Sequence, residues 1–361
     1  TYTCLTFLNK TKQEKILFNK YFEGDFNYYL DNYNKNLSTV VYENLKSKKW
    51  RLLLNKDQKN INKIENIGRQ IGELFTINVG IATLRDDLYF VDGKDDNGYF
   101  KVLEGKKYKI ESELVKSIYK ISDFNDQNDC NLNQRKIIFP YRIINNKSVI
   151  FEESELENSY PNTFRYFSYI KDQLLKRSKK EVLNPFYQYG RSQGLNKFGI
   201  RLLTPTFSQK PNFLIVEEKN SLYCNGYGIH YNIDQNKVSL FDHLPIQQTE
   251  NIDVLKRILN STVMDYYVKT TSVTIDGGFP CYQKNFIELF TIPEMDNDKI
   301  QYLRRLSNQK FEDELLRIYD LNLEWYISKM SSKKLSKFKG FKSKLKSLDT
   351  ILSDISSSDV W

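Results

Sequence analysis

Hydrophobic and polar residues follow one another along this chain in patterns that predict short strands between amphipathic helices. Apolar runs bounded by turn residues predict strands at residues 1–8, 88–91, 99–102, 137–141, 149–151, 200–203, 213–216 and 238–241. Apolar residues at helical spacing predict helices within residues 61–74, 162–180, 254–268 and 300–318. Residues 10–66 are expected to be largely helical or loop-rich, with residues 50–53 as a packing anchor. The pattern predicts an α/β (α+β) fold of mixed antiparallel sheets with flanking helices and a helical C-terminal extension.

Two pairs of these strands are expected to form hairpins. Asp92-Gly93 through Asn97-Gly98 has the residues of a tight turn, and residues 99–102 follow as the returning strand. Asn145-Asn146 is expected to join residues 137–141 to residues 149–151. Because Pro140 cannot donate a backbone hydrogen bond, the first of these two strands is placed at an edge or a strand end.

Length and changes of pattern divide the chain into three expected regions. With 361 residues the chain is too long for one small core. The strand-like apolar pattern of residues 1–10 starts at the first residue, which is Thr1 rather than Met. We therefore expect the chain to be a piece of a larger protein. Residues 11–295 form the main mixed lobe. Residues 296–361 form the helical extension, in which residues 329–348 contain eight lysines and no acidic residue.

Charge and composition narrow the classes of partner. Lys and Arg exceed Asp and Glu by 54 − 45 = +9, which favours an anionic partner. No apolar run approaches the roughly 18 residues that a membrane span requires, so no membrane partner is expected. The four cysteines are scattered and form no CxxC pair, which argues against a zinc site and for a reducing cytoplasm.

Several short motifs resemble catalytic or metal-binding signatures only in part. Asn184-Pro185-Phe186-Tyr187 lacks the second proline of the Asn-Pro-Pro-Tyr motif of adenine methyltransferases, and no glycine-rich cofactor turn precedes it. We interpret it as a turn that leads into an aromatic wall. Glu217 and Lys219 supply half of a nuclease metal site, but no Asp or Glu lies between Glu181 and Glu217 to complete it.

The glycines and the histidine of residues 223–230 are also expected to be structural. Gly226 and Gly228 lack the third glycine and the following helix of a cofactor loop, so a tight strand turn is the simpler interpretation. His230 and Cys224 are expected to pack in the core. The acidic residues of 92–97 lack the order of a calcium loop and are expected at a hairpin tip. No metal site and no catalytic residue is therefore predicted.

Two polar stretches have the composition of nucleic-acid contacts. Residues 187–197 place Arg, Gln, Asn and Lys between glycines, and these side chains read base edges and bind phosphates. Residues 269–280 combine hydroxyl side chains with a glycine turn, which is typical of phosphate or base contacts. The alternative interpretation of both is a polar loop on a basic protein.

The order of four segments resembles a known family. Residues 1–5, 79–86, 189–194 and 259–293 read TYTCL, VGIATLRD, YGRSQG and a stretch from LNST to IP. They are similar, in this order, to the C-terminal region of TaqI-like adenine-specific DNA methyltransferases of single-chain type II restriction–modification proteins. The resemblance covers most of the chain up to about residue 293.

The resemblance implies a target-recognition module for double-stranded DNA. Residues 11–295 would be the recognition domain, and residues 1–10 the trailing strand of a methyltransferase domain that is absent from this chain. That domain would bind S-adenosylmethionine and flip the target adenine, whereas no cofactor is expected here. The resemblance implies a set of DNA-binding residues, to which we add Lys197 because of the composition of its loop. The full set is Gly80, Thr83, Arg85, Arg191, Gln193, Gly194, Lys197, Thr270, Thr271, Ser272, Gly277 and Gly278.

Two other functions stay open at this point. The chain could be the nuclease part of a restriction protein that acts through Glu217 and Lys219 with a metal ion. It could instead be a protein-interaction module whose C-terminal helices pack on a partner subunit. Whether the chain has an enzymatic activity of its own is undecided by the sequence.

Overall fold

The computed structural model describes residues 14–18, 37–45, 50–145, 147–177, 183–231, 249–275 and 278–328. Residues 1–305 and 306–361 form two compact units. The C-terminal extension predicted from the sequence begins at residue 296, ten positions before this division. The strands expected at residues 1–8 and 238–241, and the lysine-rich residues 329–348, lie outside the described residues.

Four antiparallel strands in the order β13–β12–β15–β4 form the largest sheet of the described residues. Their bounds are β4 (Phe75–Val79), β12 (Arg201–Pro205), β13 (Leu214–Val216) and β15 (Gly226–Tyr231). Leu202 pairs with Ile229, which pairs in turn with Ile77. The first four residues of β12 are all buried, so both faces of this strand are covered, which explains its continuous apolar sequence.

A second sheet combines strands from distant parts of the chain. β8 pairs in parallel with β14 and antiparallel with β9. The bounds are β8 (Val115–Lys120), β9 (Lys136–Ile138) and β14 (Leu222–Cys224). The short helix α5 (Gln127–Asn131) follows β8, and the carboxylate of Asp126 caps its N-terminus by accepting hydrogen bonds from the amides of Asn128 and Asp129 at 2.8 and 3.1 Å.

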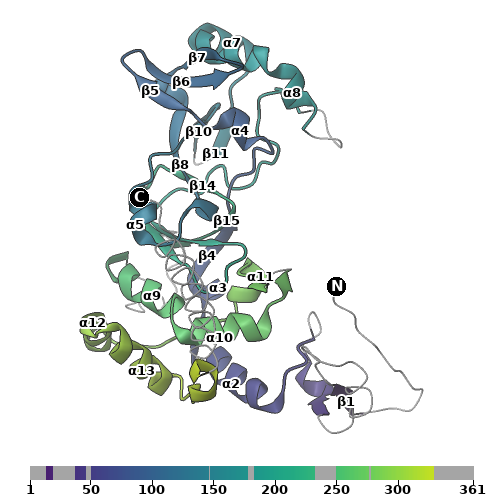
Figure 1. Cartoon of the computed structure of the whole chain (residues 1–361), viewed down its shortest axis with the longest axis vertical. Helices are drawn as coiled ribbons and strands as arrows, with labels where there is room; N and C mark the ends of the chain where they lie inside the picture. Colours follow the sequence, from purple (N-terminus) through teal and green to yellow (C-terminus); the bar gives the residue numbers. More distant parts are fainter. Residues whose placement is uncertain are drawn as a thin grey trace, which may run out of the picture. The chain divides into compact units, whose positions relative to one another are not determined.

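A three-stranded sheet, a hairpin and three helices surround an aromatic core. The strands are β5 (Gly93–Asp95), β6 (Gly98–Leu103), β7 (Lys106–Ile110), β10 (Tyr141–Ile144) and β11 (Lys147–Ile150). The helices are α6 (Glu153–Ser159), α7 (Pro161–Tyr169) and α8 (Lys171–Leu175). Helix α7 packs on strand β7, as Figure 1 shows. Helix α4 (Asp86–Tyr89) contributes Leu88 and Tyr89 to the same core.

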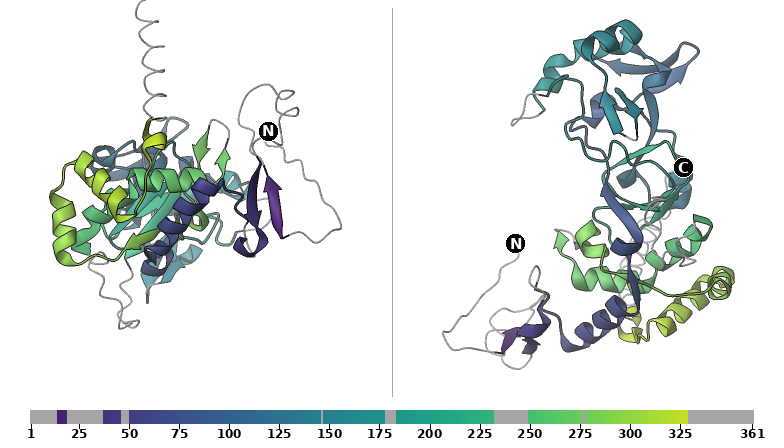
Figure 2. Two further views of the ribbon diagram at one scale, coloured as in Figure 1. Left: turned by 90° about the horizontal axis from the view of Figure 1, so that it is seen from below. Right: turned by 180° about the vertical axis from the view of Figure 1, so that it is seen from behind.

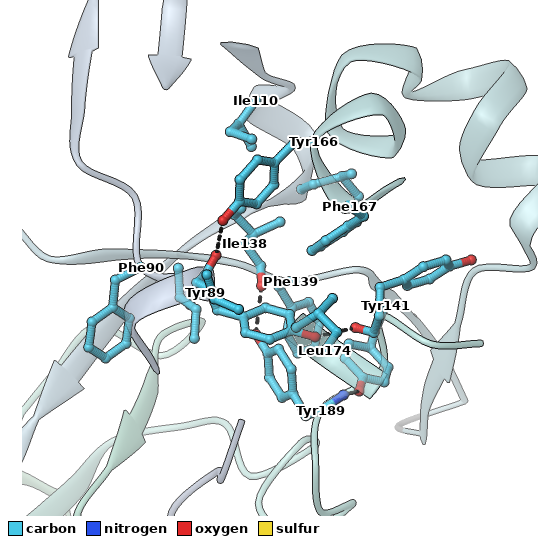
Figure 3. Close-up of a cluster of buried hydrophobic side chains, with 14 of the residues drawn as sticks. Tyr89, Phe90, Ile110, Ile138, Phe139, Tyr141, Tyr166, Phe167, Leu174 and Tyr189 are labelled. Carbon is cyan, nitrogen blue, oxygen red and sulfur yellow. Dashed lines mark hydrogen bonds between the residues drawn. The ribbon is translucent and has the colours of Figure 1, made fainter. Parts of the chain in front are cut away.

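The aromatic core is held by tyrosine hydroxyls as well as by apolar contact (Figure 3). Tyr89 donates to the carbonyl of Tyr187 at 2.8 Å, and Tyr189 donates to that of Ile138 at 2.7 Å. The rings of Tyr89 and Tyr189 meet edge to face, with centroids 5.0 Å apart. Because a buried hydroxyl is costly unless it is hydrogen-bonded, these bonds fix the rings and the backbone that they reach.

The remaining described elements are helices and short strand pairs. Their bounds are β1 (Lys15–Phe18), β2 (Ser38–Val41), α2 (Asn55–Asn66), β3 (Gly68–Gln70), α3 (Ile71–Leu74), α9 (Ile252–Leu259), α10 (Thr262–Thr271), β16 (Thr274–Ile275), β17 (Phe279–Pro280), α11 (Lys284–Ile287), β18 (Thr291–Pro293), α12 (Asn297–Arg305) and, in the second unit, α13 (Asn308–Ile318). Strands β1 and β2 pair antiparallel, and β2 contacts the neighbouring helix α2 (Figure 2). Four single turns of 3-10 helix complete the set at Tyr42–Asn44, Ser112–Leu114, Ile121–Asp123 and Thr249–Asn251.

The structure confirms the predicted mixed α+β class and most of the predicted elements. Hairpins are present at both predicted places, but the first strand of each differs from the prediction: β5 lies within the expected turn at 92–98, and β10 begins where the expected strand at 137–141 ends. Helices occupy 161–175 and 297–318 apart from short breaks. The helix predicted at 254–268 is divided at Asn260, and Ser261 caps its second half, α10, with its hydroxyl oxygen. Pro140 lies between the end of β9 and the start of β10. This agrees with the strand end predicted from its missing backbone N–H donor.

Three predictions about local structure were wrong. Residues 88–91 are not a strand, because Leu88 and Tyr89 lie in helix α4; a short, fully buried apolar run has no period to distinguish the two. The N-terminal region contains the strand pair β1–β2 within what was expected to be helix or loop. Trp50 of the expected packing anchor is 60% exposed, whereas Leu53 is buried.

Candidate functional site

The first two predicted loops lie against each other although they are far apart in sequence. Ala82 and Arg191 form an antiparallel bridge, in which the Arg191 amide donates to the Ala82 carbonyl at 3.1 Å. The Gly190 amide donates to the Thr83 carbonyl at 3.2 Å, and Gln193 Nε2 to the Gly80 carbonyl at 3.4 Å. Residues 80–85 and 189–194 therefore form one backbone unit.

The glycines of these loops serve close backbone approach. Gly194 has φ +74°, and a Cβ atom there would lie 2.8 Å from the Gly80 carbonyl carbon. A Cβ atom on Gly80 would lie 2.5 Å from the Tyr223 carbonyl oxygen. Both positions therefore require glycine for packing, and their role at the site is to shape the backbone that carries the polar side chains.

Thr83 and Arg85 have different surroundings. The Thr83 side chain is buried, where its hydroxyl accepts from the Arg85 amide at 3.1 Å and donates to the Asp86 carboxylate. Arg85 forms an ion pair with Asp87 at 2.8 Å and donates to Gln173 at 3.2 Å. The hydrogen bond from Arg85 lowers the pKa of the Asp87 carboxyl below its usual value. Thr83 thus holds the loop, and Arg85 links it to helix α8 at the surface.

Arg177 joins the loops to the segment after helix α8, and it is not among the DNA-binding residues predicted from the sequence. Its guanidinium donates to the Tyr89 hydroxyl at 2.6 Å and to the carbonyls of Phe186 at 3.0 Å, Thr83 at 3.5 Å and Gln188. Because most of these acceptors are backbone carbonyls, no sequence pattern marks them. The only signal was a basic residue at the end of a predicted helix.

Arg191 is exposed, and its guanidinium has no partner among the residues that the structure describes. The Lys171 ammonium lies over the ring of Phe186 at 4.7 Å. We call Arg85, Lys171, Arg177 and Arg191 the arginine surface, because the bonds above connect the three segments that carry them. Carboxylates also lie on these segments, but those of Asp86 and Asp87 are occupied by Thr83 and Arg85.

The other two residues expected in the second loop lie close to its backbone. Gln193 is half-buried by its bond to Gly80. Lys197 is half-buried as well, and its amide donates to the Gly194 carbonyl at 3.4 Å. Both side chains are partly accessible at the border of the arginine surface.

The third predicted stretch uses most of its hydroxyls within the fold. Thr271 is buried and donates to the Tyr267 carbonyl at 2.8 Å, while Thr270 is half-buried at the end of α10. Ser272 accepts from the Cys281 amide at 3.2 Å. Gly278 is exposed with φ +75°, and Gly277 lies outside the described residues. The described backbone bonds of the β16–β17 turn lead to residues 206–208 rather than to the first two loops.

Tyr187 confirms the interpretation of residues 184–187 as a turn into an aromatic wall. Its ring is buried and stacks on Phe167, with centroids 5.3 Å apart and an interplanar angle of 15°. Its hydroxyl donates to the Phe151 carbonyl at 2.6 Å. Both the face and the hydroxyl of this tyrosine are therefore occupied by the protein itself.

Glu217 and Lys219 are exposed in the segment after β13. The neighbouring Glu218 carboxylate accepts a hydrogen bond from the Tyr119 hydroxyl at 3.2 Å. Within the described ranges, no group of three or more His, Cys, Asp or Glu side chains is placed to hold a metal ion. Glu217 therefore belongs to no such group among these residues.

His230 and Cys224 are core residues, as predicted. His230 Nε2 lies 2.9 Å from the Tyr223 hydroxyl, and burial together with the charge of Arg201 lowers the pKa of the imidazole to about 3. Burial raises the pKa of the Cys224 thiol to about 12. A neutral imidazole and a protonated thiol in the interior are poor candidates for catalysis at neutral pH.

A groove of about 920 Å³ lies apart from the predicted site residues. Its walls come from the start of the β5–β6 hairpin and from residues 123–136, and they carry both signs of charge. Arg135, which lines it, pairs with Asp123 at 2.7 Å. No helix of the described residues is long and apolar enough to span a membrane.

Comparison with known proteins gives one informative similarity. No protein-family model matches the chain. The chain is 27% identical over 356 residues to the type II restriction enzyme and methyltransferase RM.Eco57I of Escherichia coli. The match covers 86% of this chain but 33% of that protein, so the chain spans about a third of the length of this relative. The chain is thus distantly homologous to part of a type II restriction–modification enzyme.

Proposed function

We propose that this chain is the target-recognition region of an adenine-specific DNA methyltransferase within a type II restriction–modification protein. It binds a specific double-stranded DNA sequence and positions the target adenine for flipping by a catalytic domain outside these 361 residues. The observation that carries the proposal is the arginine surface, where two loops with DNA-binding composition form one unit beside the exposed guanidinium of Arg191.

The side chains of this surface fit two kinds of DNA contact. Lys171 is an exposed cation, which suits binding to phosphates, whereas Arg85 is half-buried and paired with Asp87. Arg191 is exposed and not held by a carboxylate of the described residues, so it can reach a guanine edge with two parallel hydrogen bonds. Gln193 and Lys197 border it from the same loop.

The distant homology supports the remaining parts of the proposal. S-adenosylmethionine is bound by the catalytic domain, and this domain, as part of the same protein, is the second partner of the chain. The DNA that such a protein modifies lies in the bacterial cytoplasm, and we place the chain there.

Selection from a randomised duplex pool tests the function directly. The chain is incubated with the pool at low and at near-physiological salt, and bound duplexes are sequenced. We expect one motif to be enriched at the higher salt, where non-specific phosphate binding is weak. Absence of binding even at low salt would contradict the proposal and favour a protein-interaction module, which a concentration-dependent mass without DNA would then reveal.

Replacing Arg191 with Ala tests the role of the arginine surface. We expect the selected motif to become degenerate at one position, with a loss of about 1–3 kcal/mol for the preferred duplex and an unchanged melting temperature. Arg305→Ala is the matched control, because Arg305 is also exposed but lies on α12. Equal binding of wild type and Arg191→Ala to every duplex would rule out this assignment.

A nuclease activity is tested with the same protein and magnesium. Nicking of the selected duplex that is abolished by Glu217→Gln would replace the recognition proposal with the nuclease alternative. We expect no difference between wild type and Glu217→Gln, because the described residues place no group of three or more His, Cys, Asp or Glu side chains there to hold a metal ion.

A further inference from the structure

Leu84 has a backbone conformation that its residue type disfavours. Its φ is +61°, in the left-handed region where a Cβ atom crowds the following carbonyl oxygen. The side chain is also 42% exposed, so burial contributes little to compensate for the strain. Single exposed leucines are common on protein surfaces. An exposed leucine with a strained backbone at a candidate binding surface is uncommon.

The surrounding bonds hold Leu84 in this conformation from both sides. Before it, the Thr83 carbonyl accepts from the Gly190 amide at 3.2 Å. After it, the Arg85 amide donates to the Thr83 hydroxyl at 3.1 Å, and helix α4 begins. The edge-to-face contact of Tyr89 and Tyr189 further fixes the two segments to each other (Figure 3). The strained conformation is therefore imposed by a rigid scaffold.

The side chain of Leu84 is supported from one side by Gly190. A Cβ atom on Gly190 would lie 2.4 Å from Leu84 Cγ, so the leucine rests directly on the glycine backbone. Arg85 follows Leu84 and Arg191 follows Gly190 in the chain, so both contacting residues belong to the segments that carry the arginine surface. Leu84 is thus a partly exposed apolar side chain on these segments.

We propose that Leu84 is an apolar wedge that enters one base step of the bound duplex and partly unstacks it. Proteins that deform DNA insert Leu, Ile, Phe, Met or Pro side chains in this way, and cations beside the wedge hold the flanking nucleotides. A fixed backbone suits this role, because the side chain keeps its position while bases are pushed apart. The inference rests on the proposed function, since it requires that the arginine surface binds DNA.

The test uses permanganate, which oxidises thymines that are unstacked, on the selected duplex with thymines placed at successive steps. We expect one hyper-reactive step when the wild-type chain is bound. Leu84→Asn keeps a similar size and tolerates a left-handed backbone, but it is polar. We expect this variant to lose the reactive step and to bind about ten- to a hundredfold more weakly, the range for one buried leucine side chain.

Two controls separate the wedge from a structural role. Leu132→Asn makes the same change at a leucine that is 78% exposed beside the groove, and it should bind and unstack DNA like the wild type. Leu84→Met keeps an apolar side chain and should keep the reactive step. We also expect the melting temperature of Leu84→Asn to be no lower than that of the wild type, because asparagine relieves the strain.

The outcomes distinguish this inference from the proposed function. Specific binding by the wild type without any hyper-reactive step would overturn the wedge and leave the recognition role intact. A reactive step that persists in Leu84→Asn would also overturn it. Failure of the wild type to bind any duplex would overturn both, and a reactive step that only Leu84→Asn loses would support both.

Discussion

His230 and Arg201 show how burial sets the charge state of single residues in this protein. They are directly opposite each other on the antiparallel strands β15 and β12. Arg201 is fully buried without a carboxylate partner in the described part of the chain, and its guanidinium donates to the Ser221 carbonyl at 2.9 Å and the Gly199 carbonyl at 2.7 Å. Because two cations opposite each other would repel, His230 has to stay neutral.

The pH dependence of stability should reveal this neutral histidine. The folded pKa of His230 is about 3 and its usual value is 6.5, so the unfolded chain binds more protons between them. We expect its contribution to be complete above about pH 6.5 and to be lost as the pH falls toward 3, with a slope of up to about 1.4 kcal/mol per pH unit.

Urea unfolding at several pH values checks this expectation. His230→Gln should flatten the slope relative to the wild type, whereas His243→Gln is the control for the other histidine of the chain. Since the chain has two histidines, their imidazole NMR signals can be assigned with these variants. A His230 signal that titrates near its usual pKa would contradict the buried neutral state.

At the scale of elements, one carboxylate joins strand β7 to helix α7. Glu111 follows β7 and accepts hydrogen bonds from the amides of Asn162 and Thr163, at 2.9 and 2.8 Å, in the first turn of α7. Burial alone would raise the pKa of Glu111. The hydrogen bonds from the backbone amides and the side chains of Asn162 and Thr163 outweigh burial and lower the pKa. The helix N-terminus thus receives its acceptor from another element.

Replacing Glu111 with Gln should loosen this junction. A glutamine has one acceptor oxygen and turns donors toward the helix amides, so we expect a loss of about 1–3 kcal/mol in the free energy of unfolding at neutral pH. Glu113→Gln is the matched control, since Glu113 is exposed in the same segment.

The same carboxylate predicts a change with acid. Because its pKa is lowered in the fold, its contribution is present above the usual pKa of 4.5 and is lost as the pH falls below it. The difference between wild type and Glu111→Gln should therefore shrink in acid. A difference that stays constant across this range would show that the charge of Glu111 is unimportant.

At the scale of the whole molecule, the net charge affects the affinity for DNA, whereas the side chains of single loops affect which sequence is preferred. The chain carries +9, and residues 329–348 contribute eight lysines to it. Lysines that bind phosphates add affinity without sequence preference and make it depend on salt. Base-reading side chains such as Arg191 change the preferred sequence instead.

Substitution of two lysines in this segment tests that distinction. We expect Lys334→Ala with Lys337→Ala to weaken binding to all duplexes alike and to reduce the salt slope by about one for each phosphate that the variant no longer neutralises. The selected motif should remain that of the wild type. Fluorescence anisotropy over a series of salt concentrations measures both, and an altered motif or unchanged binding would contradict the prediction.

The sequence by itself determined the mixed α+β class, the places of both hairpins and the positions of most helices. These follow from local rules, because turn residues and apolar spacing act within a few positions of the chain. Helix α4 was not predicted by these rules, since it has four residues, of which two are buried, and so short a segment shows no period. The sequence also showed the basic charge and the two loops that the structure brings together.

Only the tertiary structure decided which polar side chains of those loops remain available. Gly80 and Gln193 are joined by a hydrogen bond although they lie 113 positions apart, and no local pattern encodes that pairing. Thr83 and Thr271 match the composition of a binding loop, but the fold buries them and uses their hydroxyls. Arg191 stays exposed while Arg177 is bound to backbone carbonyls of distant residues. The reason is physical: a hydrogen-bonding group is occupied or available according to what the folded chain places beside it.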